Sequence, residues 1–140
     1  MNVLVDTCIW SYALRYRNKT ESVAAQHSTE LLNLISETRV CMIGPIRQEL
    51  LSGIKDENRF NILREKLSAF PDTELISEDY ETAARFFNLA RSRGVQGSNT
   101  DFLICAVANR LKYPLYTTDK DFELLAGFLP LKLYTPRDCG

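Results

Sequence analysis

The sequence has few of the side chains that build soft-metal and redox sites. Among its 140 residues there is one histidine, His27, and its four cysteines include no closely spaced pair. A zinc knuckle or a dithiol redox motif needs two such ligands within a few positions, so both are excluded. His27 lies within a predicted helix and is interpreted as a structural or surface residue. Cys41 and Cys105 lie in apolar runs that are typical of core cysteines.

Long apolar runs and strong charge are also lacking. No stretch approaches the roughly 20 residues that cross a bilayer, and the N-terminal residues do not have the pattern of a signal peptide. We therefore expect a cytoplasmic protein that makes no membrane contact. The formal net charge of −1 excludes a protein that coats nucleic acid by bulk charge, but it does not exclude an enzyme that binds a few phosphates.

Two common catalytic motifs are absent. The sequence contains no Gly-rich phosphate-binding loop, and no serine or cysteine has the surroundings of a nucleophile elbow. The remaining candidates for chemistry are carboxylates.

Short apolar runs alternate with helical patterns along the chain. Strands are predicted at residues 3–5, 40–43, 74–76, 115–117 and 131–134. Helices are predicted at residues 9–16, 22–37, from 44 onward, 58–70, 77–93 with Ser77 as N-cap, from 101 onward, and 121–126. Continuous apolar strands that alternate with amphipathic helices are typical of a parallel sheet covered on both faces. We therefore predict a single α/β domain over residues 1–140, with a parallel central sheet of about five strands.

Four carboxylates lie where predicted strands end or helices begin. Asp6 ends the first strand, and Asp119 follows the fourth. Glu49 lies in the helix opened by Gly44-Pro45, and Asp101 opens another helix. Parallel α/β sheets bind ligands beyond the carboxyl ends of their strands, so we expect these acids to converge. An all-oxygen pocket of this kind is suited to hard divalent cations.

Each acid also has a purely structural alternative. Asp6 can cap the helix that follows it, and Glu49 can be an ordinary exposed helix residue. Ser98-Asn99-Thr100-Asp101 and Thr118-Asp119-Lys120-Asp121 both match a capping box. Capping and ion binding are compatible at Asp101, because a helix N-terminus stabilises negative charge.

Crowded carboxylates repel one another, and a bound cation relieves that repulsion. A pair of divalent ions can orient water and stabilise the charge that develops on a phosphodiester during in-line displacement. The hydroxyl of Thr118 or Thr7 is a candidate to hold a water molecule or a phosphate oxygen. The pattern therefore favours phosphodiester hydrolysis.

Four segments in this order and spacing resemble the PIN-domain nucleases, and within them the VapC-type toxins of bacterial toxin–antitoxin pairs. They are VDTCIW (5–10), IRQELLSG (46–53), DFLICAVA (101–108) and YTTDKDF (116–122). The resemblance implies a PIN-like (Rossmann-like) fold and an endoribonuclease that depends on Mg²⁺ or Mn²⁺. It also implies an RNA substrate, a homodimer and a cognate VapB-like antitoxin.

By the same resemblance, the catalytic and metal-binding residues are Asp6, Glu49, Asp101 and Asp119. Asp121 is implied as an auxiliary acid, with the Thr118 hydroxyl near the site. Cys8 is a departure, because the family often has a small polar residue at this position. Thiols are poor ligands for magnesium, so we expect Cys8 to pack or to hydrogen-bond weakly.

The first predicted helix carries aromatic and basic side chains. Tyr12, Arg15 and Arg17 are candidates for RNA or partner contact, because aromatic rings stack on unpaired bases. Trp10 is interpreted as a core residue.

Three alternatives to a toxin nuclease were considered. Two keep the PIN fold: a housekeeping nuclease in RNA processing, and a catalytically inactive binding module. Retention of all four acids disfavours the inactive module. The third is a phospho-receiver domain, which needs an aspartate at the end of its middle strand and a lysine after its last strand. Here the third predicted strand ends in Ile76-Ser77-Glu78, so this class is disfavoured.

Overall fold

The computed structural model describes residues 1–14 and 22–137. Its centre is a parallel sheet in which β1 (Val3–Val5) lies between β2 (Val40–Cys41) and β3 (Leu115–Tyr116). All three side chains of β1 are buried. A strand buried on both faces needs a continuous apolar run, as the sequence has here.

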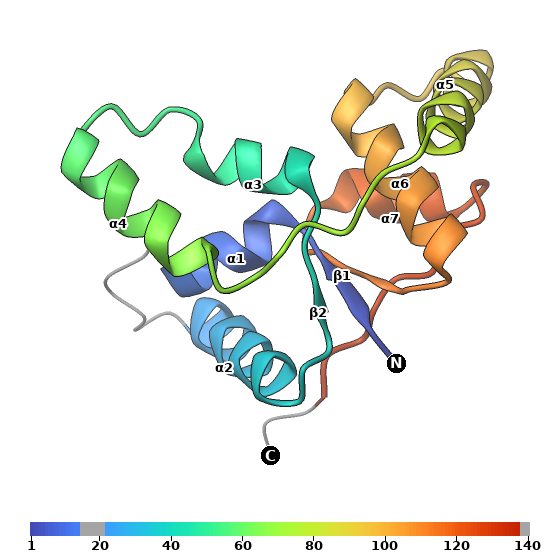
Figure 1. Cartoon of the computed structure of the whole chain (residues 1–140). Helices are drawn as coiled ribbons and strands as arrows, with labels where there is room; N and C mark the ends of the chain where they lie inside the picture. Colours follow the sequence, from blue (N-terminus) through green and yellow to red (C-terminus); the bar gives the residue numbers. More distant parts are fainter. Residues whose placement is uncertain (15–21, 138–140) are drawn as a thin grey trace.

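Seven helices surround this sheet in the described ranges. They are α1 (Thr7–Leu14), α2 (Ser22–Ser36), α3 (Gly44–Leu51), α4 (Glu57–Leu67), α5 (Ser77–Ser92), α6 (Asn99–Leu111) and α7 (Lys120–Ala126). Figure 1 shows α1 to α4 on one side of the strands and α5 to α7 on the other. The predicted parallel α/β architecture is therefore confirmed.

The predicted number of strands was wrong, since the described residues form three rather than five. The segment 74–76 is not a strand, and its neighbour Asp72 makes only an isolated parallel bridge to Met42. The carbonyl oxygen of Glu74 instead accepts a hydrogen bond of 3.1 Å from Arg110 Nη2. That carbonyl is therefore engaged by a side chain rather than by a neighbouring strand.

The segment 131–134 is likewise reduced to one parallel bridge, between Leu115 and Leu133. Leu115 donates its N–H to the carbonyl of Lys132 at 2.8 Å, and its carbonyl accepts from Tyr134 at 2.7 Å. Two residues further on, Pro136 has no N–H to continue a ladder. Through these single bridges the two outer segments lie beside β2 and β3.

The apolar stripes predicted for the helices form the core. Ile46 and Leu50 of α3 and Ile104 and Val107 of α6 are all fully buried. Trp10 is 1% exposed, and its indole N–H donates to the carbonyl of Val5 at 3.1 Å. Its predicted core role is confirmed. No helix in the described ranges is long and apolar enough to cross a membrane.

The start of α5 differs from the prediction. Its N-cap is Ile76 rather than Ser77. The Ile76 N–H donates to Asp79 Oδ2 at 3.0 Å, so the carboxylate satisfies a backbone group that the helix leaves unpaired. Asp79 is only 1% exposed and also pairs with Arg110, whose Nε lies 2.7 Å from Asp79 Oδ1. This buried pair joins α5 to α6.

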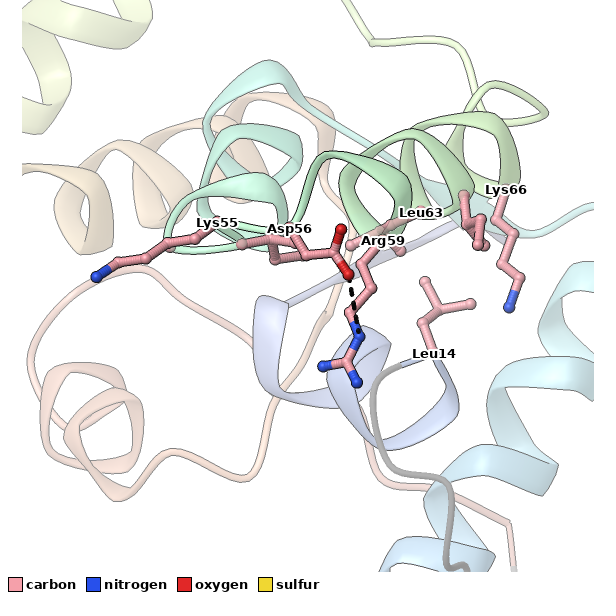
Figure 2. A pocket seen from close by; sticks show the side chains of 9 residues that line it. Leu14, Lys55, Asp56, Arg59, Leu63 and Lys66 are labelled. Carbon is pink, nitrogen blue, oxygen red and sulfur yellow. Dashed lines mark ion pairs between the residues drawn. The ribbon is translucent and has the colours of Figure 1, made fainter.

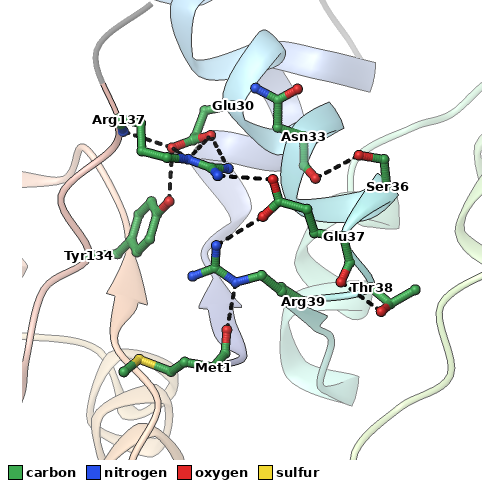
Figure 3. Close-up of polar contacts among 9 residues, drawn as sticks. All are labelled: Met1, Glu30, Asn33, Ser36, Glu37, Thr38, Arg39, Tyr134 and Arg137. Atoms are coloured by element: carbon green, nitrogen blue, oxygen red, sulfur yellow. Dashed lines mark hydrogen bonds and ion pairs between the residues drawn. The ribbon is translucent and has the colours of Figure 1, made fainter.

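A second buried carboxylate fastens the end of the described chain to α2, as Figure 3 shows. Glu30 accepts hydrogen bonds from the backbone N–H and the guanidinium of Arg137, and from the hydroxyl of Tyr134. Arg137 also pairs with Glu37 at 2.9 Å. Burial acts to raise the pKa of Glu30, but the bonds from Arg137 and Tyr134 outweigh it and hold that pKa below its ordinary value.

The strand order reverses beside the end of β1. From β1 the chain passes through α1 and α2 to β2 on one side, and then through α3 to α6 to β3 on the other. The point at which the strand order reverses is where parallel α/β sheets bind their ligands. Asp6 follows β1 and Thr117 follows β3 at this edge.

Candidate functional site

Asp6 occupies the end of β1 and is held by its own turn and by the neighbouring strand. Its side chain is 6% exposed. Oδ1 accepts from the N–H of Thr7 at 2.8 Å, and Oδ2 accepts from the hydroxyl of Thr117 at 2.8 Å. Its carbonyl oxygen also accepts from the N–H of Ile9 at 3.1 Å. The carboxylate is therefore fixed by the first N–H of α1 and by the residue after β3, and it does not accept from the second or third N–H of the helix, as a capping side chain would.

Burial raises the pKa of Asp6, and the negative charge of Asp101 adds to the rise. Partial burial likewise raises the pKa of the Glu49 carboxyl, and the charges of Asp6 and Asp101 raise it further. These three acids come from β1, α3 and α6 and lie within electrostatic range of one another. The predicted convergence of all four acids in one pocket stays a prediction.

Asp101 lies in the first turn of α6 and closes the predicted capping box. Its N–H donates to the hydroxyl of Ser98 at 3.1 Å, and its Oδ2 accepts from the N–H of Ser98 at 3.1 Å. Cys105 lies one turn further along α6. Burial raises the pKa of this thiol to about 12, with contributions from the charges of Asp101 and Asp6. Cys105 is therefore an uncharged core residue under the acid cluster.

Asp119 lies at the rim of the site and not within the electrostatic cluster. It is the exposed N-cap of α7, and its Oδ1 accepts from the N–H of Asp121 at 2.9 Å. The predicted capping motif was therefore one position off, because Asp119 rather than Thr118 is the cap. The backbone N–H of Asp119 donates to Thr117 Oγ1 at 3.0 Å. Asp121 is an exposed residue of the first turn of α7.

Thr117 is the residue that the sequence analysis missed. Its hydroxyl donates to Asp6 and accepts from the backbone of Asp119, so it joins the ends of β1 and β3. The available signal was its place at the last position of the fourth predicted strand, 115–117. This signal identifies Thr117 only if the fourth strand is known to pair with the first, with Val5 beside Tyr116.

The two hydroxyls named from the sequence have different surroundings. Thr7 Oγ1 is buried and makes no hydrogen bond to the described residues. Thr118 Oγ1 lies 3.4 Å from Cys8 Sγ and 3.5 Å from the hydroxyl of Tyr12. Cys8 Sγ also lies 3.6 Å from Asp6 Oδ2. These long contacts agree with the expectation that Cys8 hydrogen-bonds weakly.

Tyr12 and His27 form a stacked pair beside the site. Their ring centroids are 5.6 Å apart with an interplanar angle of 19°. His27 Nδ1 lies 2.6 Å from the hydroxyl of Tyr116, and burial lowers the pKa of this histidine. His27 thus has the predicted structural environment. Arg15 and Arg17, the other two candidates for RNA or partner contact, lie outside the described residues.

The carboxylates do not form a closed ligand set. In residues 1–14 and 22–137, no three His, Cys, Asp or Glu side chains are arranged tightly enough to hold a metal ion. The donor chemistry nevertheless fits a hard cation, because the groups that act on one another here are carboxylates, whose oxygens are the ligands that such cations prefer.

A cationic pocket of about 570 Å³ lies elsewhere on the molecule, between the end of α1 and α4 (Figure 2). Lys55, Arg59 and Lys66 line it together with apolar side chains such as Leu14. Arg59 pairs with Asp56 at 3.8 Å. None of the four predicted catalytic acids lines this pocket.

A family model described as "PIN domain" matches residues 3–127. The chain belongs to the PIN-domain family. Within this family it groups with the VapC ribonucleases. VapC ribonuclease Mb1587 of Mycobacterium bovis is 33% identical over 134 residues, which cover 93% of this chain and 96% of the relative.

Solved structures support the same PIN fold. VapBC2 from Rickettsia felis, bound to a DNA fragment from its promoter, matches with a TM-score of 0.73 and 20% identity, covering 96% of this chain and 98% of the other. A toxin–antitoxin complex from Klebsiella pneumoniae matches with a TM-score of 0.65 and 20% identity, covering 98% and 99%.

Proposed function

We propose that this PIN-domain protein is a metal-dependent endoribonuclease and the toxin of a toxin–antitoxin pair. One observation carries the proposal. Burial raises the pKa of Asp6 and of Glu49, and the charge of Asp101 adds to the rise at both, as does that of Asp6 at Glu49. Unpaired negative charge concentrated at a ligand-binding edge is costly unless a cation binds there.

In this proposal Asp6, Glu49 and Asp101 hold Mg²⁺ or Mn²⁺, with Asp119 contributing from the rim. A bound divalent ion supplies Lewis-acid stabilisation of the charge that develops on the phosphodiester oxygens. No three of the described acids are grouped closely enough to hold one ion, so binding by three of them requires side-chain rotation. Glu49 and Asp119 are solvent-exposed and have that freedom.

The other residues of the site position the carboxylates. Thr117 and the N–H of Thr7 each hold one oxygen of Asp6, and Oδ1, which accepts only from Thr7 among the described residues, keeps a further lone pair for a ligand. The capping bond from Ser98 uses only one oxygen of Asp101. The first turn of α6 adds the partial positive charge of a helix N-terminus, which favours an approaching phosphate. Asp121 and Thr118 are assigned auxiliary roles.

The activity is tested by incubating purified wild type and Asp6→Asn with a mixed RNA pool in Mg²⁺, Mn²⁺ or chelator. Wild type is expected to cleave only with a divalent ion, and Asp6→Asn is expected to lose cleavage. Glu65→Gln, which neutralises an exposed acid on α4, serves as the matched control and should retain activity. Cleavage that survives both Asp6→Asn and chelator would refute the proposal.

The toxin assignment is supported by the relatives and by the toxin–antitoxin complex of the same fold. The proposed partners are RNA and a VapB-like antitoxin, and the proposed assembly is a homodimer. Growth arrest on expression without a partner would separate a toxin from a housekeeping nuclease. Sedimentation of the purified chain would measure the oligomeric state.

A further inference from the structure

His27 is the only histidine in the sequence, and it lies between two tyrosines that border the candidate site. Its ring stacks on Tyr12 of α1, with centroids 5.6 Å apart and an angle of 19° between the planes. Its Nδ1 lies 2.6 Å from the hydroxyl of Tyr116 of β3. One side chain of α2 therefore contacts α1 and β3 at the same time.

Tyr116 links this contact to Asp6 through the backbone. The carbonyl oxygen of Tyr116 accepts from the N–H of Asp6 at 2.9 Å. The next residue, Thr117, donates its hydroxyl to Asp6 Oδ2 at 2.8 Å. A displacement of Tyr116 would therefore disturb two hydrogen bonds of Asp6, one to its backbone and one to its carboxylate.

The Tyr116 side chain is fully buried and packed on two sides. Its ring centroid lies 5.5 Å from that of His27 and 5.0 Å from that of Tyr134. Tyr134 is itself held, because its hydroxyl donates to the buried Glu30 at 2.8 Å (Figure 3). Protein interiors are close-packed, so removal of the His27 ring would leave a cavity on one side of Tyr116.

Tyr12 provides a second contact between His27 and the same segment of the chain. The Tyr12 hydroxyl lies 3.5 Å from Thr118 Oγ1. Cys8 Sγ lies 3.4 Å from the backbone nitrogen of Thr118 and 3.4 Å from its Oγ1. Residues 116–118 are thus held at Tyr116 and at Thr118, and His27 contacts the tyrosine ring at each place.

An uncharged imidazole suits these surroundings. Burial lowers the pKa of His27 below its ordinary value of 6.5, so the ring is neutral at pH 7. A neutral ring stacks on one phenol and hydrogen-bonds to another without burying an ion. An apolar side chain of similar size would fill the space, but it would take this hydrogen-bond partner away from the buried Tyr116.

We propose that His27 is a positioning residue of the candidate site, because it holds residues 116–118 in the geometry that fixes the Asp6 carboxylate. This inference rests on the proposed metal-dependent ribonuclease function and adds to it a residue on α2. His27 acts through Tyr116 and Tyr12, so its loss impairs metal use and turnover rather than the binding of RNA.

The first test compares wild type with His27→Ala. Gln26→Ala is the matched control, because Gln26 is the exposed neighbour on the same helix. Cleavage of single-stranded RNA is measured over a Mg²⁺ series. His27→Ala is expected to lower kcat about tenfold, as the loss of one hydrogen bond would, and to raise the Mg²⁺ concentration for half-maximal rate. Its KM for RNA should stay unchanged, and Gln26→Ala should match wild type. An effect on KM alone, or none, would overturn the proposal.

Two further variants test how His27 acts. His27→Asn places an amide near the position of Nδ1, so it should recover part of the activity through the bond to Tyr116. In a Thr117→Val background, His27→Ala should lower the rate only about twofold more, because both substitutions act on the same carboxylate. Equal losses in His27→Asn and His27→Ala, or full additivity with Thr117→Val, would each contradict the proposed role.

Hydrogen exchange in chelator tests the positioning without catalysis. The N–H of Asp6 donates to Tyr116, and the N–H of Leu4 donates to Pro114 at 3.0 Å in the same strand pair. His27→Ala is expected to speed exchange at Asp6 about tenfold more than at Leu4, because the opening is local. Equal acceleration at both would mean that His27 only stabilises the fold, and unchanged exchange at Asp6 would mean that it holds nothing there. Either result overturns the inference. If wild type cleaves no RNA, the ribonuclease proposal fails, but these rates still decide whether His27 holds the segment.

Discussion

Thr117 Oγ1 donates a hydrogen bond of 2.8 Å to Asp6 Oδ2, joining two residues that lie 111 positions apart. The same oxygen accepts from the N–H of Asp119 at 3.0 Å. One hydroxyl therefore fixes a buried carboxylate and the turn that carries another acid. This makes Thr117 a positioning residue of the candidate site.

Thr117→Val is expected to lower RNA cleavage about 10- to 100-fold in kcat/KM, because a hydrogen bond to a charged group contributes about 1.5 to 3 kcal/mol. The Mg²⁺ concentration that gives half-maximal rate should rise, since Asp6 is no longer fixed. Steady-state rates over a magnesium series measure both effects. Thr117→Ser should restore most of the activity, and Thr29→Val on the exposed side of α2 should leave it unchanged. Equal rates for Thr117→Val and wild type would contradict a positioning role for Thr117.

Asp6→Asn is expected to stabilise the metal-free protein at pH 7. The raised pKa of Asp6 means that ionisation of this buried carboxyl opposes folding. The folded pKa lies above the ordinary value of 3.8, so the free energy of unfolding of the wild type falls as the pH rises from 3.8 to the folded pKa. The gain from Asn should be present at pH 7 and should vanish well below pH 3.8, where both states are protonated. Urea unfolding in chelator measures it, and a destabilised variant at pH 7 would contradict the reasoning.

Asp101 has two roles that separate under different substitutions. Asp101→Asn keeps an oxygen acceptor for the N–H of Ser98, so its stability in chelator should stay close to that of wild type or rise slightly. Asp101→Ala loses the acceptor and should cost about 1 kcal/mol, as for other capping residues. Both variants should lose metal-dependent cleavage. Thermal unfolding and cleavage assays on the same preparations measure the two roles, and equal destabilisation by Asn and Ala would argue against the cap.

Arg137→Ala is expected to destabilise the protein at pH 7, because it leaves the buried Glu30 without its cation. The lowered pKa of Glu30 stabilises the fold above the ordinary value of 4.5, and this contribution is lost as the pH falls through the folded pKa. The difference between Arg137→Ala and wild type should therefore shrink below pH 4.5. Unfolding curves from pH 3 to pH 7, with the exposed Arg64→Ala as control, follow this change. A pH-independent difference would mean that packing rather than charge is lost.

The central elements of the fold could be predicted because their sequence signal is local. Val3, Leu4 and Val5 form a short, continuous apolar run. Such a run is typical of a strand whose side chains are buried on both faces of the sheet. The loss of the two outer strands could not be predicted, because residues far away in the sequence decide whether these segments pair with a neighbouring strand. The carbonyl of Glu74 is engaged by Arg110, and the sequence does not indicate that contact.

The candidate site likewise contains residues that the local sequence identifies and residues that it does not. Asp6 follows a strand and Asp101 completes a capping motif, so each position is marked by its own neighbours in sequence. The role of Thr117 depends on the pairing of β1 with β3, which no local pattern gives. Asp79 resembled an ordinary first-turn acid, whereas its burial against Arg110 arises from the packing of α5 on α6.

The pairing of β1 with β3 also has a consequence for biosynthesis. Asp6 is translated before Thr117, so the hydroxyl that holds its carboxylate is supplied only when position 117 has left the ribosome. An unfinished chain that stops before β3 lacks this contact. Under the proposed activity, we therefore expect a nascent chain to be inactive until β3 has been made and has paired with β1.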